Sequence, residues 1–488
     1  MQDPASSAAS SLARCPHPRT RSSKPSDLAA LRATLFFTAD DGIHGRELWK
    51  SDGTKRGTVL LKDISSGPSG SGPTYLTTVG RTLFFTASDT IHGRELWKSD
   101  GTRHGTVLVK DIKPGPRGQH DGPTYLTAVD GKLLFTADDR AHGTELWKSD
   151  GTKRGTVLVK DVGRGRSSSY PSSLTAVGET LFLLAGSTHG TELWKSNGTK
   201  AGTVLVKTLN PGGMSNDYDY DPASLTAAGT LLYFTDDDET HGRELWKSNG
   251  TKAGTVLVKD IYPGGFDSDG YRYPNESYPS FLATVGGKLY FAATDSTRGR
   301  ELWSSNGTKA GTLLVKDIRP GTEGDYPLSS SPSYLTALGD KLFFTATDGV
   351  HGEELWRSGG SGSSTVLVKD IANGRAAGSP SSLTAVGERL FFTALDGVHG
   401  KELWKSDGTG SGTGLVKDIS RCAGHYAGLS SLTRARSTLF FAASDSRHGS
   451  ELWKSNGTKA GTVMVRDINT RRPGARSAAA GSRKAGAP

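Results

Sequence analysis

The sequence predicts an all-β protein, a β-propeller of about nine four-stranded antiparallel blades. The tripeptide Glu-Leu-Trp occurs nine times and accounts for all nine tryptophans of the 488-residue chain. Short apolar runs between Gly-containing turns are typical of many short strands. Large apolar residues stand next to one another, as in Leu35-Phe36-Phe37. This indicates strands that are covered on both faces, which stacked propeller blades provide.

Each repeat is expected to contain four strands, as residues 124–162 illustrate. The first, YLTAV, is small and suits a crowded centre, and the second is KLLFTA. The third, TELWKS, follows a loop that ends in His-Gly, and the fourth is VLVKDV. An Asp-Gly or Asn-Gly pair between the last two strands predicts a type I′ hairpin turn. The Lys-Asp that ends most fourth strands suggests an exposed outer edge, protected by charge from pairing with another chain.

Nine blades exceed the four to eight that are usual. The first repeat begins with its inner strand near Leu28 and the last ends with its outer strand at Ile468, so no spare strand remains to complete a shared blade. We therefore expect a nine-bladed ring over residues 26–468 that is closed by side-chain packing. Eight blades with a displaced unit, or an open β-solenoid, are the alternatives.

The two ends of the chain carry most of the net charge of +9. Residues 1–25 and 469–488 are rich in Ser, Ala, Gly and Pro as well as basic residues, and both are predicted to be disordered tails. A nucleic-acid-binding protein would carry its basic patch on the folded surface instead. No stretch is apolar enough for a membrane helix, and two cysteines, Cys15 and Cys422, exclude a disulfide scaffold.

The octapeptide ELWKSDGT at 47–54 and its copies resemble the bacterial ELWxxDGT repeat family. The resemblance covers about residues 26–468, and the seventh copy departs from it with ELWRSGGS at 354–361. It implies a propeller-type repeat protein that is secreted or on the cell surface, and it brings no catalytic residues. Residues 1–32 contain no apolar core of a signal peptide, so a cytoplasmic location stays open as well.

Three long connections between consecutive repeats interrupt the pattern, at 210–223, 262–279 and 319–332. They hold seven of the fourteen tyrosines together with many carboxylates. Tyr offers a large apolar area with a polar tip, which suits recognition, and loops on a rigid scaffold often bind ligands. The alternative is a set of tolerated, solvated insertions. The candidate ligand-binding residues are Tyr218, Tyr220, Tyr262, Tyr271, Tyr273, Tyr278, Tyr326, Asp219, Asp269 and Asp325.

No catalytic residue is assigned. Eight histidines recur before Glu-Leu-Trp, but one per blade on a wide circle would not converge on a metal, so a structural role is expected. The nine repeated glutamates are expected to bond a turn or a neighbouring blade. Calcium is the only cofactor that the sequence leaves open, because alternating carboxylates form fragments of a calcium loop. These weak candidates are Asp217, Asp219, Asp221, Asp267 and Asp269.

The sequence therefore favours a monomeric, non-catalytic binding or adhesion scaffold. Its Tyr/Asp-rich loop face would take a glycan, a peptide or a protein. Two alternatives stay open: a propeller-class hydrolase or lyase with a site in the central channel, and a purely structural surface repeat protein. Nucleic acid is disfavoured, since carboxylates would repel its phosphates.

Overall fold

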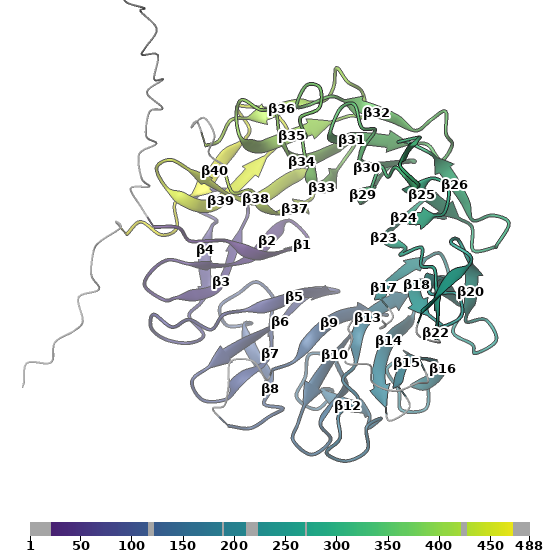
Figure 1. Cartoon of the computed structure of the whole chain (residues 1–488). Coiled ribbons are helices and arrows are strands. Elements are labelled where there is room, and N and C mark those ends of the chain that lie inside the picture. Colours follow the sequence, from purple (N-terminus) through teal and green to yellow (C-terminus); the bar gives the residue numbers. More distant parts are fainter. Residues whose placement is uncertain are drawn as a thin grey trace, which may run out of the picture.

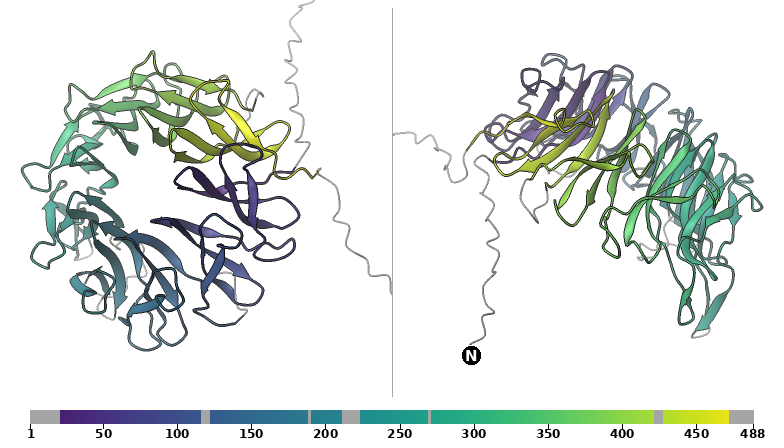
Figure 2. Two further views of the ribbon diagram at one scale, coloured as in Figure 1. Left: turned by 180° about the vertical axis from the view of Figure 1, so that it is seen from behind. Right: turned by 90° about the horizontal axis from the view of Figure 1, so that it is seen from above.

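The computed structural model describes residues 21–115, 122–187, 190–210, 223–268, 271–420 and 427–471. It confirms the nine-bladed propeller: nine four-stranded antiparallel sheets follow one another around a ring, and the described residues contain no helix (Figure 1). Hence none of these residues belongs to a helix that could cross a membrane. Figure 2 shows the ring from behind and from above.

Each blade is built from four consecutive strands, with the first strand innermost (Figure 1). The first strands are β1 (Ser26–Leu31), β5 (Thr74–Val79), β9 (Thr124–Val129), β13 (Ser172–Val177), β17 (Ala223–Ala228), β23 (Ser280–Val285), β29 (Ser333–Leu338), β33 (Ser381–Val386) and β37 (Ser430–Ala435). The second strands are β2 (Thr34–Asp40), β6 (Thr82–Asp89), β10 (Lys132–Asp138), β14 (Thr180–Ser187), β18 (Leu231–Asp237), β24 (Lys288–Asp295), β30 (Lys341–Thr347), β34 (Arg389–Leu395) and β38 (Thr438–Asp445).

The outer half of each blade contains the Glu-Leu-Trp strand and the edge strand. The third strands are β3 (Arg46–Ser51), β7 (Gly93–Ser99), β11 (Thr144–Ser149), β15 (Gly190–Ser196), β19 (Arg243–Ser248), β25 (Gly299–Ser305), β31 (Glu353–Ser358), β35 (Lys401–Ser406) and β39 (Gly449–Ser455). The fourth strands are β4 (Val59–Lys62), β8 (Val107–Lys110), β12 (Val157–Lys160), β16 (Val204–Asn210), β20 (Val256–Lys259), β26 (Leu313–Lys316), β32 (Val366–Lys369), β36 (Gly414–Lys417) and β40 (Val463–Arg466).

Side chains from neighbouring blades form the core, one cluster at each junction. Phe37 and Trp49 of the first blade, for example, pack with Phe440 and Leu452 of the last. Most of the repeated tryptophans are at most 6% exposed. Adjacent apolar residues of one strand thus pack on opposite faces of the sheet, as predicted. Burial of these side chains between neighbouring blades stabilises the ring through the hydrophobic effect.

The ring closes without any exchange of strands. The inner strand β1 lies against β37, and the Arg21 N–H donates to the Arg471 carbonyl at 2.8 Å. Ser23 is buried against the last blade, where its hydroxyl donates to Glu451. Residues 21–25 and 469–471 were predicted to belong to disordered tails, and here the prediction was wrong, because they complete the closing junction. The remainder of both predicted tails lies outside the described residues.

The turn between the third and fourth strands differs from the predicted two-residue type I′ turn. In the first blade it covers residues 52–58, and only Gly53 of the Asp-Gly pair has positive φ, at 87°. The Asp52 carboxylate accepts hydrogen bonds from the N–H and the hydroxyl of Thr54. In eight blades the Asp or Asn therefore serves as a side-chain acceptor, and in the seventh, which has Gly359, the Ser364 hydroxyl accepts instead. The repeated turn glycine also lies close to a neighbouring blade: in the second blade, a Cβ on Gly101 would stand 3.3 Å from Phe36 of the preceding blade.

A basic residue of each fourth strand, Lys in eight blades and Arg466 in the ninth, links blades, which corrects the expectation of an exposed edge charge. Lys110 donates to the carbonyl of Thr156 in the next blade at 2.8 Å, and its ammonium lies 5.4 Å from the Trp147 ring. Lys207 lies 4.6 Å from the ring of Trp246 in the same way. An ammonium over an indole is attracted by the negative face of the ring, so this lysine stabilises the junction.

Candidate functional site

Two sets of connections share one end of the ring, which we call the loop end. It carries the connections between second and third strands and those between consecutive blades, because successive strands are antiparallel. The short turns after the first and third strands lie at the opposite end. The described residues contain two inserted hairpins, one between β20 and β23 and one between β26 and β29. Both connect consecutive blades, so they lie at the loop end of adjacent blades.

The larger insertion forms a hairpin of its own, β21 (Gly265–Ser268) with β22 (Tyr271–Pro274). Phe266 stacks on Tyr273 with ring centroids 5.3 Å apart, and the Asp267 carboxylate pairs with Arg272 at 3.2 Å. Tyr271 is 70% exposed. Cross-strand pairs stabilise the hairpin, so its aromatic rings are held in place while open to solvent.

The second insertion contains a shorter hairpin, β27 (Thr322–Glu323) with β28 (Tyr326–Pro327). Tyr326 is 79% exposed, and Asp325 beside it is exposed as well. The Leu328 N–H donates to the Gly321 carbonyl at 2.9 Å and closes the base of the hairpin. Like the first hairpin, it exposes an aromatic side chain that does not belong to a hydrophobic core cluster.

The remaining candidates divide into three groups. Tyr278 is exposed, whereas Tyr262 is half-buried and its N–H donates to Glu244, which gives it a supporting role. Asp267 bonds Arg272, and the described residues contain no group of three or more potential metal ligands. The candidates that lie outside the described residues are Tyr218, Tyr220, Asp217, Asp219, Asp221 and Asp269.

The repeated glutamate organises the connection between blades. Glu47 accepts hydrogen bonds from the N–H groups of Ser65 and Ser71 and from the Ser71 hydroxyl at 2.6 Å. Ser65 follows the fourth strand and Ser71 precedes the next blade. Glu145 and Glu301 bond Ser169 and Ser330 in the same way. The carboxylate therefore fixes the path of the loop, as expected from its burial.

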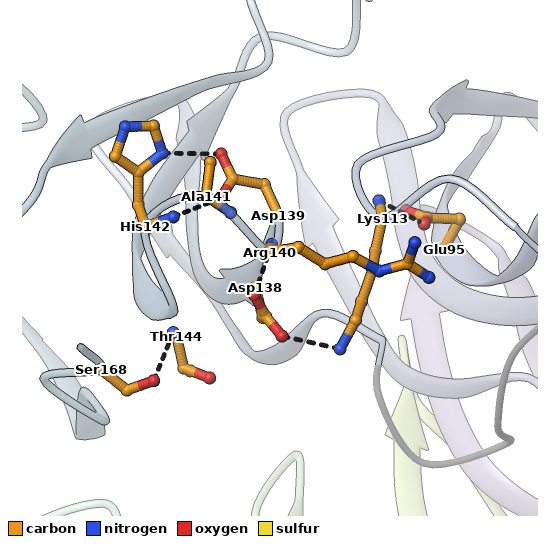
Figure 3. A network of polar contacts seen from close by, with 9 residues as sticks. All are labelled: Glu95, Lys113, Asp138, Asp139, Arg140, Ala141, His142, Thr144 and Ser168. Carbon is orange, nitrogen blue, oxygen red and sulfur yellow. Dashed lines mark hydrogen bonds and ion pairs between the residues drawn. The ribbon is translucent and has the colours of Figure 1, made fainter. Parts of the chain in front are cut away.

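The repeated histidine caps the loop between the second and third strands. His142 Nδ1 lies 2.9 Å from the Asp139 carboxylate, which also accepts the His142 N–H (Figure 3). Nearby, the Lys113 ammonium pairs with Asp138 of the next blade at 2.7 Å. Among the histidines that the structure describes, seven form this pair with Asp, and Arg298 pairs with Asp295 in the sixth blade. The geometry supports the structural role.

One acidic residue breaks the repeat. At its position in the second strand every other blade has Ala, whereas the fifth blade has Asp236, opposite Glu244. Asp236 is 1% exposed, its Oδ1 accepts no hydrogen bond, and burial raises the pKa of this carboxyl to about 7. Burial likewise raises the pKa of Glu244 to about 8. The replacement of the repeated Ala by Asp in the fifth blade is visible in the sequence, but the sequence analysis did not identify Asp236 as a candidate.

Comparisons with known proteins add no function. No family model and no curated protein matches the chain. Similar solved structures include a prolyl endopeptidase (13% identity, TM-score 0.37, 70% of this chain and 48% of that one) and the acylaminoacyl peptidase of Pyrococcus horikoshii (9%, 0.35, 76% and 56%). A puromycin-hydrolyzing peptidase of Mycobacterium tuberculosis is similar at 10% identity and a TM-score of 0.35, over 78% of this chain and 60% of that one. The chain thus spans about half of these proteins, and the likeness is too low to carry an argument about activity.

Proposed function

We propose that the protein is a non-catalytic binding scaffold that recognises a glycan, peptide or protein ligand with its inserted loops. The observation that carries this proposal is the pair of hairpins on adjacent blades at the loop end. Their aromatic side chains, Tyr271 and Tyr326 above all, are exposed although the hairpins are internally braced. Rigid exposed aromatic residues cost little conformational entropy on binding.

The rest of the ring supports a scaffold role. The repeated Glu, His and Lys side chains each bond a loop or a neighbouring blade, so these residues hold the loops in position. The exposed carboxylates of Glu323 and Asp325 favour a neutral or cationic ligand over nucleic acid. We further propose that the protein is a monomer and, from its resemblance to the ELWxxDGT repeats, that it acts outside the cell or on its surface.

For the hydrolase or lyase alternative, Asp236 is the best candidate for a catalytic carboxyl group. A side chain that is 1% exposed would not reach a substrate without a change in the surrounding packing. The other acids with raised pKa values, such as Glu301 and Glu451, are engaged by serines of the blade connections. We therefore favour binding over catalysis.

A glycan and peptide array tests the proposal. The wild-type chain is compared with a variant in which residues 262–279 and 319–332 are shortened to the length of the connection between the first two blades. A matched control replaces Ile91, an exposed residue of the second blade, with Ser. We expect the shortened variant to fold and to lose the ligands that the wild type and the control retain. If it keeps all of them, the binding site lies elsewhere.

A further inference from the structure

The inner strands carry a backbone feature that recurs in every blade. The second residue of each first strand has φ between 51° and 58°. A register shift in the pairing with the second strand accompanies it. The nine residues are Asp27, Tyr75, Tyr125, Ser173, Ser224, Phe281, Tyr334, Ser382 and Ser431. Positive φ is unfavourable for bulky residues, so the choice of side chain at this position requires an explanation.

The fold itself does not require an aromatic side chain there. Four blades have Ser at this position with the same backbone conformation. The four aromatic residues, Tyr75, Tyr125, Phe281 and Tyr334, are 44–47% exposed, so they contribute little to the core. The next residue, Leu76 in the second blade, packs into the junction between blades instead. Bulky side chains thus occupy a strained position while remaining open to solvent, which is typical of functional sites.

The four aromatic residues form two pairs on neighbouring blades. Tyr75 and Tyr125 belong to the adjacent strands β5 and β9, and Phe281 and Tyr334 belong to β23 and β29. The rings of Phe281 and Tyr334 are 6.2 Å apart and inclined by 39°. Figure 1 shows the two strand pairs on opposite sides of the ring's centre. All four residues are near the start of their strands, and hence toward the loop end.

Hydroxyl groups surround these pairs, and the charged side chains beside them are engaged by neighbouring polar groups. Thr77 and Thr127 donate to the carbonyls of Tyr75 and Tyr125 at 3.0 and 2.9 Å, which fixes the backbone at each aromatic residue. Asp27 is the only charged residue among the nine. The guanidinium of Arg94 bonds Thr74 at the start of β5, and that of Arg300 bonds Ser280 at the start of β23. Beside Tyr334, the Glu353 carboxylate accepts a hydrogen bond from Thr345. A neutral ligand with both hydroxyl groups and apolar faces would match this lining.

We propose that the two aromatic pairs are stacking subsites for the pyranose rings of a neutral oligosaccharide. The C–H faces of a sugar ring pack on the aromatic faces, and its hydroxyls meet the Ser and Thr hydroxyls of the neighbouring positions. The pairs would take two separate sugar units, or two chains, across the centre of the ring. This proposal involves no residue of the inserted hairpins, so it can be tested independently of the proposed ligand binding by the inserted loops.

Isothermal titration calorimetry with four neutral hexasaccharides tests the proposal: β-1,4-linked glucose, β-1,4-linked N-acetylglucosamine, β-1,4-linked mannose and α-1,4-linked glucose. We expect at least one to bind the wild type. The double variants Tyr75→Ser/Tyr125→Ser and Phe281→Ser/Tyr334→Ser should each weaken binding by about tenfold. Both should fold, because Ser occupies the same position in four blades. Tyr170→Ser is the matched control, an exposed tyrosine with φ of 46° outside the first strands.

A gain-of-binding variant provides the second test. Ser382 follows Tyr334 in the next blade and has φ of 55°, so Ser382→Tyr should extend the pair to three rings and tighten binding severalfold. Absence of binding by all four hexasaccharides would overturn the proposal. So would double variants that bind as well as the Tyr170→Ser control. If the loop-shortened variant binds the hexasaccharide normally while the double variants do not, the inner site stands and the loop proposal fails for this ligand.

Discussion

The Ser23 hydroxyl donates a hydrogen bond to Glu451 Oε2 at 2.6 Å, although the two residues are 428 positions apart in the sequence. The Ser23 N–H also donates to the other carboxylate oxygen, at 3.0 Å. Ser71 makes the same two contacts with Glu47 at an internal junction. The ends of the ring are therefore joined by the contact that joins its interior blades, and closure needs no strand from one end to complete a blade at the other.

Removal of the Ser23 hydroxyl should weaken this closure. Ser23→Ala leaves a buried carboxylate oxygen short of a donor, and we expect a loss of roughly 1–3 kcal/mol in the free energy of unfolding, measured by urea denaturation. Ser71→Ala should cost a similar amount, and the exposed Ser66→Ala should cost nothing measurable. If Ser23→Ala were as neutral as Ser66→Ala, the segment before β1 would not contribute to closure.

Replacement of Asp236 by the residue of the other blades should stabilise the protein. Asp236→Ala removes a buried carboxyl whose Oδ1 has no hydrogen bond, and we expect a gain of about 1–2 kcal/mol at pH 7. Because burial raises its pKa, Asp236 destabilises the folded state more as pH rises, so the gain should be larger at pH 8 than at pH 5.5. A destabilised variant would show that the carboxyl has a favourable partner.

The thermal stability of the ring should increase as pH falls from 8.5 to 5.5. Burial raises the pKa of Glu95, Glu301, Glu354 and Glu451 to about 7 and that of Glu244 to about 8. A raised pKa means that the folded state binds protons more tightly than the unfolded state, so acidification through this range favours folding. The hydrogen bond that the His142 ring donates to the Asp139 carboxylate raises the pKa of His142, and this shift acts in the same direction.

Calorimetric melting curves across this pH range check the expectation. The increase in Tm should be smaller in Glu244→Gln, which cannot titrate, than in the wild type. It should be unchanged in Glu179→Gln, a control at an exposed turn residue. A Tm that falls steadily from pH 8.5 to 5.5 would contradict the inferred pKa shifts.

The tryptophan at each junction should contribute through packing rather than through its N–H. Trp246→Ala should cost roughly 3–5 kcal/mol, since it leaves a cavity between the fourth and fifth blades. Trp246→Phe should cost clearly less, because the buried Nε1 has no hydrogen-bond partner to lose. Denaturant unfolding of both variants checks this. Equal losses would indicate that the indole nitrogen has an interaction that packing does not explain.

The repeat predicted most of the fold because each blade repeats the same local signals. Nine copies of Glu-Leu-Trp gave the blade number, and adjacent apolar residues predicted burial on both faces. The role of Glu47 followed from its position beside a buried indole. The seven-residue turn around Asp52 was missed because Asp-Gly is compatible both with a type I′ turn and with a side-chain-braced loop, and the two differ only in contacts that form after folding.

Two features of the candidate sites were not predictable from local sequence. Tyr75 and Phe281 look like ordinary strand residues, since aromatic residues favour β-structure. Their positive φ arises where the strand bends at its bulge, which no residue preference signals. Ser23 belongs to a basic, Ser-rich segment that looks disordered, and only the distant Glu451 makes it part of the core. The insertions, by contrast, were visible because they interrupt the repeat.

Hydrogen–deuterium exchange with a bound ligand tests the central claim, recognition at the loop end, most directly. A ligand from the array is compared with ligand-free protein, and the Ile91→Ser control is treated in parallel. We predict protection of peptides covering 262–268, 271–279 and 319–332, while the opposite-end turns, such as 52–58, exchange at unchanged rates. Protection confined to those opposite-end turns, with none on the two hairpins, would contradict the account.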